Sequence, residues 1–157
     1  PSDREALLEG LRRGLLDVVA TDHAPHTAEE KKNPYTKAPS GGPMVQHSLV
    51  AMLELASRGE ILVTDVVNRM CHTPARLFGI EKRGFLREGY FADMVLVNPL
   101  APWTVNRGNI LYQCGWSPLE GTTFNHLVTH TFVNGYPAFE NGVFNPLQPG
   151  MRLTFNR

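Results

Sequence analysis

The chain has 157 residues, of which 42% are hydrophobic, and this length and composition predict a globular chain with a sizeable core. Its 15 Lys and Arg residues are balanced by 15 Asp and Glu residues, which excludes the strongly basic surface of a protein that binds nucleic acid or anionic membranes. No stretch approaches the roughly 20 apolar residues of a membrane helix, and two cysteines outside any metal-binding spacing indicate reduced thiols, so a cytoplasmic location is expected.

The expected elements begin with a helix and a strand. Ser2 and Glu5 form a capping box ahead of an apolar leucine stripe, which predicts a helix over residues 3–13. Residues 17–21 are apolar on both faces, as is typical of a strand buried in a parallel sheet. Residues 22–43 are then polar and rich in Pro and Gly, and a loop of this length in a compact domain is often functional.

Three helices should follow this loop. Residues 44–57 predict the first, and Thr64 can cap a second that runs through Cys71. Thr73 and Pro74 supply an N-cap and a first-turn proline for the third, which should end at Gly79.

After the helices the chain becomes rich in β-branched and aromatic residues. One strand is expected before Pro99. Asn134-Gly135 lies between two strand-like runs, which is the strongest short signal for a β-hairpin.

Asp22 is the first candidate for chemistry, because it directly follows the predicted strand. The carboxyl ends of parallel strands form the active-site edge of α/β sheets and barrels. An aspartate there can ligate a metal ion or act as a general base. The alternative is a structural role, in which Asp22 caps the next turn or pairs with a lysine, and its position alone leaves both roles open.

His23 and His26 follow Asp22 and are possible zinc ligands. Two histidines do not complete a site, because catalytic zinc usually takes three protein ligands. The remaining candidates are scattered along the chain without a metal-binding spacing, and we expect structural roles for His47, His72, His126 and His130. His126 and His130 should project from the same face of one strand.

Ser40, Gly41 and Gly42 precede the first helix after the loop. Their small side chains leave backbone N–H groups unobstructed, and such groups near a helix start favour an anion. A flexible turn has the same composition, so this pattern indicates an anion site only in combination with the Asp-His-His segment.

Three stretches together closely resemble the C-terminal part of dihydroorotases, which belong to the amidohydrolase superfamily. They are "ATDHAPHTAEEKK" from Ala20, "APSGGP" from Ala38 and "GFLREGYFADMVLVN" from Gly84. The first is specific to dihydroorotases. The third contains a superfamily-wide pattern of two glycines followed by Ala92-Asp93, which marks the return of the chain into a small β-sandwich.

The resemblance implies an α/β fold that forms the C-terminal part of a (β/α)8 amidohydrolase barrel plus a segment of a small β-sandwich. Residues 1–82 would belong to the barrel, with the eighth strand at about 17–21, the active-site loop at 22–43 and helices to residue 79. Residues 83–157 would form the β-rich segment of the sandwich.

The resemblance also implies an activity, the zinc-dependent reversible hydrolysis of dihydroorotate to N-carbamoyl-aspartate in pyrimidine biosynthesis. Asp22 would ligate zinc, accept the proton of the attacking water and deliver it to the leaving nitrogen, so ring opening should be favoured at higher pH and ring closure at lower pH. His26 and the backbone of Ser40, Gly41 and Gly42 would bind the substrate carboxylate, while His23 would orient the loop.

The same resemblance sets the expected partners and limits. One or two zinc ions would be held mostly by residues outside this chain, so we expect the 157 residues alone to be inactive. The partner would be a small-molecule substrate, with neither nucleic acid nor membrane involved, and the enzyme would be a homo-oligomer, a dimer.

Three alternatives stay open at this point. The parent could be another cyclic amidohydrolase, such as a hydantoinase or dihydropyrimidinase. It could be a non-catalytic dihydroorotase-like structural partner, although the intact "TDHAPH" argues against that. A stand-alone small binding domain is favoured only by the length of the chain.

Overall fold

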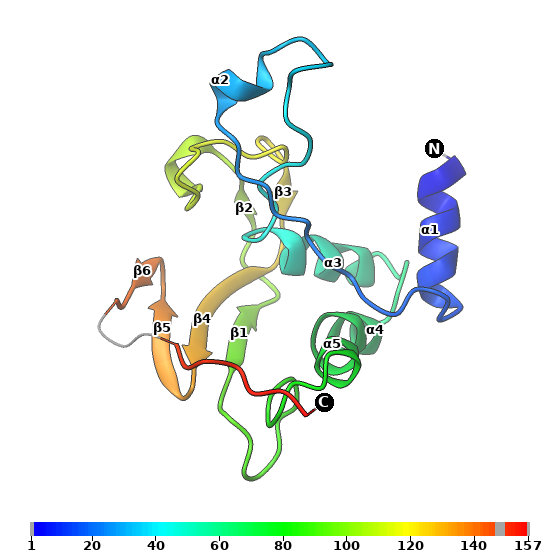
Figure 1. Cartoon of the computed structure of the whole chain (residues 1–157), viewed down its shortest axis with the longest axis vertical. Helices are drawn as coiled ribbons and strands as arrows, with labels where there is room; N and C mark the ends of the chain where they lie inside the picture. The colour runs from blue at the N-terminus through cyan, green and yellow to red at the C-terminus, as the bar shows by residue number, and fades with distance from the viewer. Residues whose placement is uncertain (1, 147–149, 157) are drawn as a thin grey trace.

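The computed structural model describes residues 2–146 and 150–156 and begins with a helix that stands at the edge of the molecule (Figure 1). This helix, α1, spans Ser2–Arg12 and confirms the predicted N-terminal helix. It buries Leu8 and Leu11, whereas Leu7 on the same stripe is exposed.

Residues 17–21 do not form the expected strand. The segment belongs to no β-ladder among the described residues, and Val19 N–H donates to the carbonyl of Arg69 at 3.2 Å instead. A strand exists only where a neighbouring strand satisfies its backbone groups, and no described strand lies beside this segment. The strand prediction is therefore corrected to extended chain.

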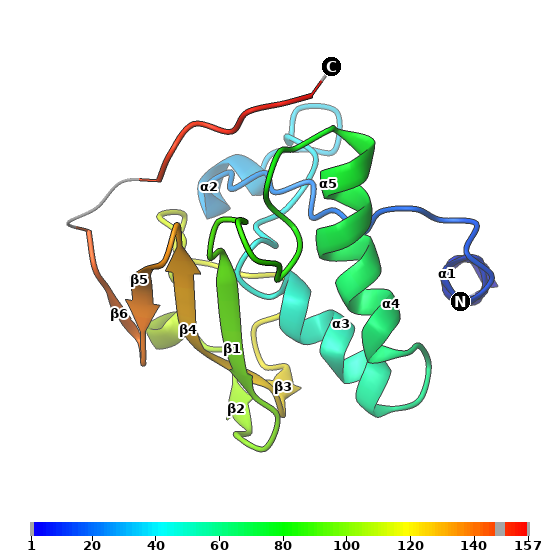
Figure 2. The same ribbon diagram turned by 90° about the horizontal axis from the view of Figure 1, so that it is seen from below.

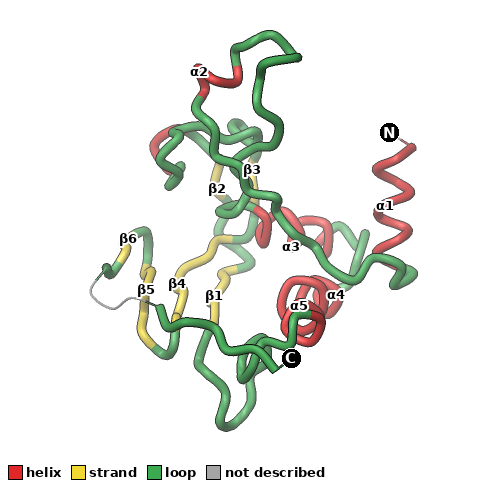
Figure 3. The backbone as a smooth tube through the Cα atoms, viewed as in Figure 1, coloured by secondary structure: helices red, strands yellow, loops and turns green. Residues whose placement is uncertain are grey.

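The predicted long loop is present over residues 22–43 and contains one short helical turn (Figure 3). This turn, α2, spans Ala28–Lys31. Thr27 accepts a hydrogen bond from Glu30 N–H through its hydroxyl, and the Glu30 carboxylate accepts from Thr27 N–H, so both ends of a capping box are formed.

Two helical segments follow instead of the three predicted. α3 spans Ser48–Ser57, four residues shorter than expected because residues 45–47 form a turn. The second and third predicted helices are one continuous rod, made of α4 (Val63–Val67), the π-helical turn η1 (Asn68–His72) and α5 (Thr73–Leu77), as Figure 2 shows.

The helix boundary predicted at Thr73-Pro74 is wrong. Thr73 has helical backbone angles and its N–H donates to the carbonyl of Asn68, five residues earlier. Pro74 has no N–H, and its ring would clash with the preceding turn of an ordinary α-helix, so the wider π turn before it lets the helix continue. The predicted cap at Thr64 is also corrected, since the Asp65 carboxylate accepts from Leu62 N–H at the start of α4.

The second half of the chain forms two small antiparallel sheets. The larger has the order β1-β4-β5-β6, with β1 at Met94–Asn98, β4 at Leu127–Val133, β5 at Tyr136–Glu140 and β6 at Val143–Phe144. The smaller pairs β2 (Trp103–Thr104) with β3 (Thr123–Phe124), and the 3-10 turn η2 (Arg107–Asn109) follows β2. The strand before Pro99 is confirmed as β1. The hairpin is confirmed too, because β4 and β5 are joined by Asn134 and Gly135 at φ 54° and 81°.

A small core connects the helices to these sheets. Val50 of α3, Val105 after β2 and Phe124 of β3 are almost fully buried against one another. Helices together with a small sheet confirm the expected α/β class. None of the helices in the described part of the chain is long and apolar enough to cross a membrane.

Candidate functional site

The two ends of the loop at residues 22–43 lie against each other, so the residues singled out at its start and end form one site. His23 and Gly42 form an isolated parallel bridge, and Ala24 N–H donates to the Gly42 carbonyl at 3.1 Å. The approach at Gly41 is so close that a Cβ atom there would lie 2.7 Å from Ala24 Cβ. Its φ of 81° also favours glycine, so sequence and backbone agree at this contact.

Lys31 holds the loop closed from inside. Its ammonium group donates to the carbonyls of Pro39 and Gly41 at 2.7 and 2.8 Å. The charged ammonium thus satisfies two carbonyl groups that lie outside any β-sheet, and these charge-assisted hydrogen bonds stabilise the closed loop.

Asp22 is exposed at the point where the chain enters this loop. Its φ of 45° places it in the left-handed region, which non-glycine residues rarely adopt. Among the described residues its carboxylate has no hydrogen bond or ion pair, so the structural alternatives of a turn cap or a lysine pair are not realised here.

His23 anchors the loop to the next element. Its Nδ1 atom accepts hydrogen bonds from the N–H groups of Met44 and Val45 at 3.1 and 3.3 Å, just before α3. Its ring lies 5.1 Å from the ring of Tyr112. These contacts agree with the expected role of His23 in orienting the loop.

His26 is fixed mainly through its backbone. Its N–H donates to the carbonyl of Ala24 at 2.9 Å, and its carbonyl accepts from the indole N–H of Trp116 at 2.8 Å. The half-buried imidazole has Nδ1 4.0 Å from a carboxylate oxygen of Glu30. Hydrogen bonds from the backbone and the hydroxyl of Thr27 lower the pKa of Glu30, which keeps this carboxylate charged beside the ring.

Ser40 and Gly41 offer open backbone donors at the end of the loop, where a Cβ atom on Gly41 would lie 3.9 Å from the Asp22 carbonyl oxygen. Neither N–H has a hydrogen-bond partner among the described residues, whereas Gly42 is engaged in the bridge to His23. Two adjacent open N–H groups can bind an oxyanion.

A buried histidine supports the loop from behind, as a packing residue. His47 is fully buried, and its Nδ1 lies 3.2 Å from both the Tyr112 hydroxyl and Ser117 Oγ. Its Nε2 has no partner among the described residues, and burial lowers the pKa of His47, which favours the neutral ring.

Tyr112 and Trp116 are the site residues that sequence reasoning missed. Trp116 contacts His26 across 90 positions of sequence, and Tyr112 contacts Gln46 across 66. No short motif surrounds either residue, so only the tertiary structure could reveal them.

The other histidines have structural contacts. His72 stacks on Phe85 with ring centroids 4.3 Å apart, and His130 lies 3.3 Å from the Glu140 carboxylate. His126 precedes β4 and is buried 3.0 Å from Glu54, so the expectation that it shares a strand face with His130 is wrong. A register shift in β4 also breaks the alternation between them.

The described residues do not by themselves fit a zinc ion. No group of three or more His, Cys, Asp or Glu side chains converges anywhere in residues 2–146 and 150–156. Asp22 could supply one ligand and no more, and a catalytic zinc usually needs three.

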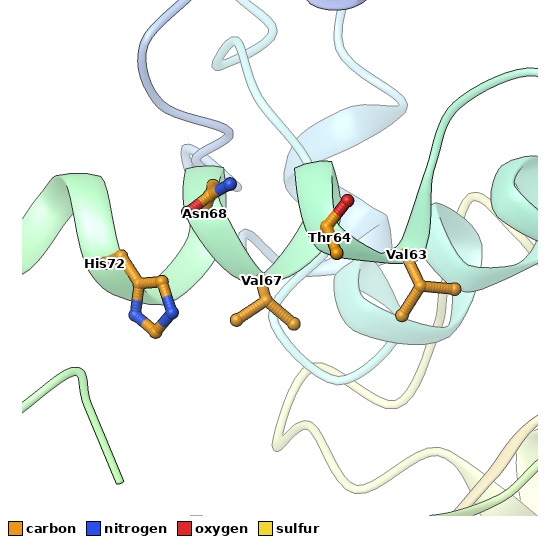
Figure 4. Close-up of a pocket in the computed structure, with 5 residues that line it drawn as sticks. All are labelled: Val63, Thr64, Val67, Asn68 and His72. Carbon is orange, nitrogen blue, oxygen red and sulfur yellow. The ribbon is translucent and has the colours of Figure 1, made fainter. Parts of the chain in front are cut away.

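A separate hollow of about 200 Å³ lies on the rod formed by α4 and η1 (Figure 4). Val63, Val67 and His72 project from one side of the rod in Figure 4, and Thr64 and Asn68 complete the lining. None of the predicted site residues contributes to it, and its floor is mostly apolar side chain rather than convergent polar groups, so it does not enlarge the site.

Comparison with known proteins identifies relatives by sequence. The chain is 43% identical over 118 residues to a dihydroorotase from Halobacterium salinarum, an alignment that covers 75% of this chain and 28% of that protein. It is 39% identical over 140 residues to a dihydroorotase from Caldanaerobacter subterraneus, covering 88% and 32%. The chain thus spans about a third of the length of the curated relatives it matches.

Comparison by structure gives related enzymes. The L-hydantoinase (dihydropyrimidinase) from Arthrobacter aurescens matches 88% of this chain and 32% of its own at a TM-score of 0.81 and 29% identity. A D-hydantoinase structure matches 91% of this chain and 32% of its own at a TM-score of 0.83 and 23% identity, which shows a shared fold. These matches confirm the expected fold class. Because the model of the amidohydrolase family matches residues 1–137, the chain belongs to the amidohydrolase family.

Proposed function

We propose that this chain supplies the C-terminal part of a dihydroorotase, which hydrolyses the cyclic amide of dihydroorotate reversibly to N-carbamoyl-aspartate. The observation that carries the proposal is the closure of the loop at residues 22–43, which brings the Gly41 backbone to the Asp22 backbone, so the exposed Asp22 and the open N–H groups of Ser40 and Gly41 lie at one loop junction. The dihydroorotases to which the chain is similar in sequence support the same activity.

In this proposal the site has an acid–base part and an anion-binding part. Asp22 accepts the proton of the attacking water and returns it to the ring nitrogen that leaves. His26 and the open N–H groups of Ser40 and Gly41 hold the substrate carboxylate, and Gly42 holds their segment in place through its bridge to His23. The backbone contacts of His26 support such a fixed position. Dihydroorotate carries a carboxylate that neutral cyclic amides lack, so this part would set specificity.

Zinc belongs to the proposal as the metal of the complete enzyme. Asp22 is the one ligand that the described residues could offer, so the remaining ligands would lie outside this chain.

Residues 1–82 would belong to the barrel and residues 83–157 to the sandwich. A cytoplasmic homodimer is the expected state of the complete enzyme.

Replacing His26 with Ala in the complete enzyme tests the proposal. A charge-assisted hydrogen bond is worth about 1.5–3 kcal/mol, so kcat/KM for dihydroorotate should fall about 10- to 150-fold. Hydrolysis of dihydrouracil, the same ring without the carboxylate, should change less than threefold, on the order of 0.6 kcal/mol. Equal losses for both substrates would contradict a carboxylate-binding role.

A hydantoinase or dihydropyrimidinase activity is the second candidate, favoured by the TM-score of 0.81 to the Arthrobacter aurescens enzyme. Steady-state assays of the wild-type enzyme with dihydroorotate and hydantoin separate the two. Preference for hydantoin would establish this second candidate in place of the first.

A further inference from the structure

Trp116 contacts both parts of the proposed carboxylate site. Its indole N–H donates to the carbonyl of His26 at 2.8 Å. A Cβ atom on Gly42 would lie 4.0 Å from the Cη2 atom of Trp116, an ordinary van der Waals distance, so the ring also lies beside the Gly42 backbone. One side chain therefore spans His26 and the glycine segment.

The segment that carries Trp116 is firmly attached to the start of α3. The Gln46 side chain accepts from Leu111 N–H at 2.9 Å and donates to the carbonyl of Asn109 at 2.8 Å. The hydroxyl of Tyr112 accepts from Gln46 N–H at 2.9 Å. These bonds hold residues 109–112, and Gly115 N–H donates to the carbonyl of Tyr112 at 3.1 Å, which links this attached stretch to the residue before Trp116.

On the other side of Trp116, the segment is fixed by buried His47. Ser117 Oγ lies 3.2 Å from His47 Nδ1 and also accepts from Leu119 N–H at 3.2 Å. Gly115 and Ser117, the two sequence neighbours of Trp116, are thus both hydrogen-bonded to attached residues, which restricts movement of the backbone that carries the indole.

His26, in contrast, has few backbone contacts of its own. Its N–H reaches only Ala24, two residues earlier within the same loop. The hydrogen bond from Trp116 ties the His26 backbone to a distant part of the fold. Without it, the position of His26 depends on local loop conformation alone.

We propose that Trp116 is a positioning residue that holds His26 at a set distance from the Ser40-Gly41-Gly42 backbone and thereby determines affinity for a carboxylate-bearing cyclic amide. The inference rests on the proposed function, in which His26 and the glycine segment bind the same substrate carboxylate. Trp116 itself touches no reacting atom in this scheme, and among the described residues no hydrogen bond joins it to Asp22.

Trp116→Phe in the complete enzyme tests this role, because it removes the N–H donor and keeps an aromatic ring against Gly42. KM for dihydroorotate should rise about three- to tenfold, the size of one lost hydrogen bond, while kcat stays within about twofold. KM for dihydrouracil should not change.

Trp103→Phe is a matched control, since the chain contains two tryptophans with the same kind of bond. The indole N–H of Trp103 donates to the carbonyl of His126 at 2.9 Å in the core, and its ring centroid lies 5.9 Å from that of His47, so Trp103 shares the packing behind the loop but has no bond to His26. This variant should lower the melting temperature at least as much as Trp116→Phe and leave both kinetic constants unchanged.

Two results would overturn the inference while His26→Ala still raises KM for dihydroorotate selectively. The first is an equal KM for dihydroorotate in wild type and Trp116→Phe. The second is a rise in KM that Trp103→Phe also shows, or that Trp116→Phe also shows with dihydrouracil, because either would indicate general destabilisation. If His26→Ala leaves KM unchanged, the carboxylate role in the proposed function is refuted, and the role of Trp116 with it.

Discussion

Asp22 combines an exposed carboxylate with a backbone conformation that few side chains adopt. A residue at φ 45° costs about 1–3 kcal/mol relative to an ordinary conformation, and such strain is concentrated at functional sites. The closed loop supports this conformation from both sides, through the bridge at His23 and the two bonds from Lys31. A strained backbone at Asp22 that the surrounding loop maintains is consistent with a carboxylate whose direction must be fixed.

Asp22→Asn tests the acid–base role, because the amide keeps the shape and cannot accept a proton. Turnover of dihydroorotate by the complete enzyme should fall more than tenfold, a barrier increase above about 1.4 kcal/mol. Asp17→Asn, a change at another exposed aspartate five positions earlier, is the control and should leave kcat within twofold. Survival of activity within tenfold in Asp22→Asn would show that another group moves the proton.

At the level of elements, the superfamily pattern at residues 84–93 joins the helical rod to the larger sheet. A Cβ atom on Gly84 would lie 2.5 Å from Ala75 Cβ and 2.7 Å from the Cys71 carbonyl, so the chain crosses the rod where only glycine fits. The Asp93 carboxylate accepts from Arg83 and from Asn134 N–H, which ties this segment to the β4–β5 turn. The pattern is thus explained by backbone approach and turn anchoring rather than by substrate contact.

Gly84→Ala and Gly89→Ala separate these two causes, because both residues have φ 77° and only Gly84 is crowded. Gly89→Ala should cost about 1 kcal/mol through its left-handed conformation. Gly84→Ala should cost about 1–3 kcal/mol more through the clash with α5 and η1. Urea unfolding monitored by circular dichroism measures both, and equal losses would mean that the rod moves away without cost.

A second contact between elements is the buried pair of Glu54 on α3 and His126 before β4, 3.0 Å apart. Burial acts to raise the pKa of Glu54, but hydrogen bonds from Asn125 N–H, from His126 and from the Asn125 amide outweigh it, so the pKa is lowered overall. The pair therefore stabilises the junction of helices and sheet only while Glu54 is ionised.

The sign of this effect gives a pH prediction. A carboxylate with a lowered pKa in the folded state contributes fully above its unfolded value of 4.5, and the contribution is lost as pH falls through the lower folded value. The free energy of unfolding should thus decrease below pH 4.5 more steeply in wild type than in Glu54→Gln. Glu88→Gln, at an exposed position, should retain the wild-type slope, and parallel curves for all three proteins would contradict the assignment.

On the scale of the whole molecule, the chain leaves much apolar surface uncovered. Leu15, Leu62 and Leu77 are 67%, 68% and 62% exposed, on or beside the helices of the N-terminal half. The chain also spans about a third of the length of its curated relatives, and no three potential metal ligands converge among its described residues. In the proposed function, the active enzyme therefore needs polypeptide beyond these residues, both to cover the apolar surface and to complete the metal site.

Zinc titration of the 157-residue chain tests this dependence. A single exposed carboxylate cannot meet the three-ligand requirement of a catalytic zinc, so calorimetry should show no tight one-to-one binding, and dihydroorotate should not be hydrolysed. Stoichiometric zinc binding that Asp22→Asn abolishes would show that the chain assembles a site by itself.

The sequence alone determined the family resemblance, the N-terminal helix, the hairpin at Asn134-Gly135 and the candidate residues of one loop. These features depend on local patterns, namely caps, turn residues and short motifs, that a few neighbouring positions specify. Tertiary structure alone decided that residues 17–21 lack a ladder, that the helix continues through Pro74, and that Trp116 reaches His26. Strand pairing, the relief of a proline by a wider turn and contacts across 90 positions depend on which distant segments come together, and no local pattern encodes that.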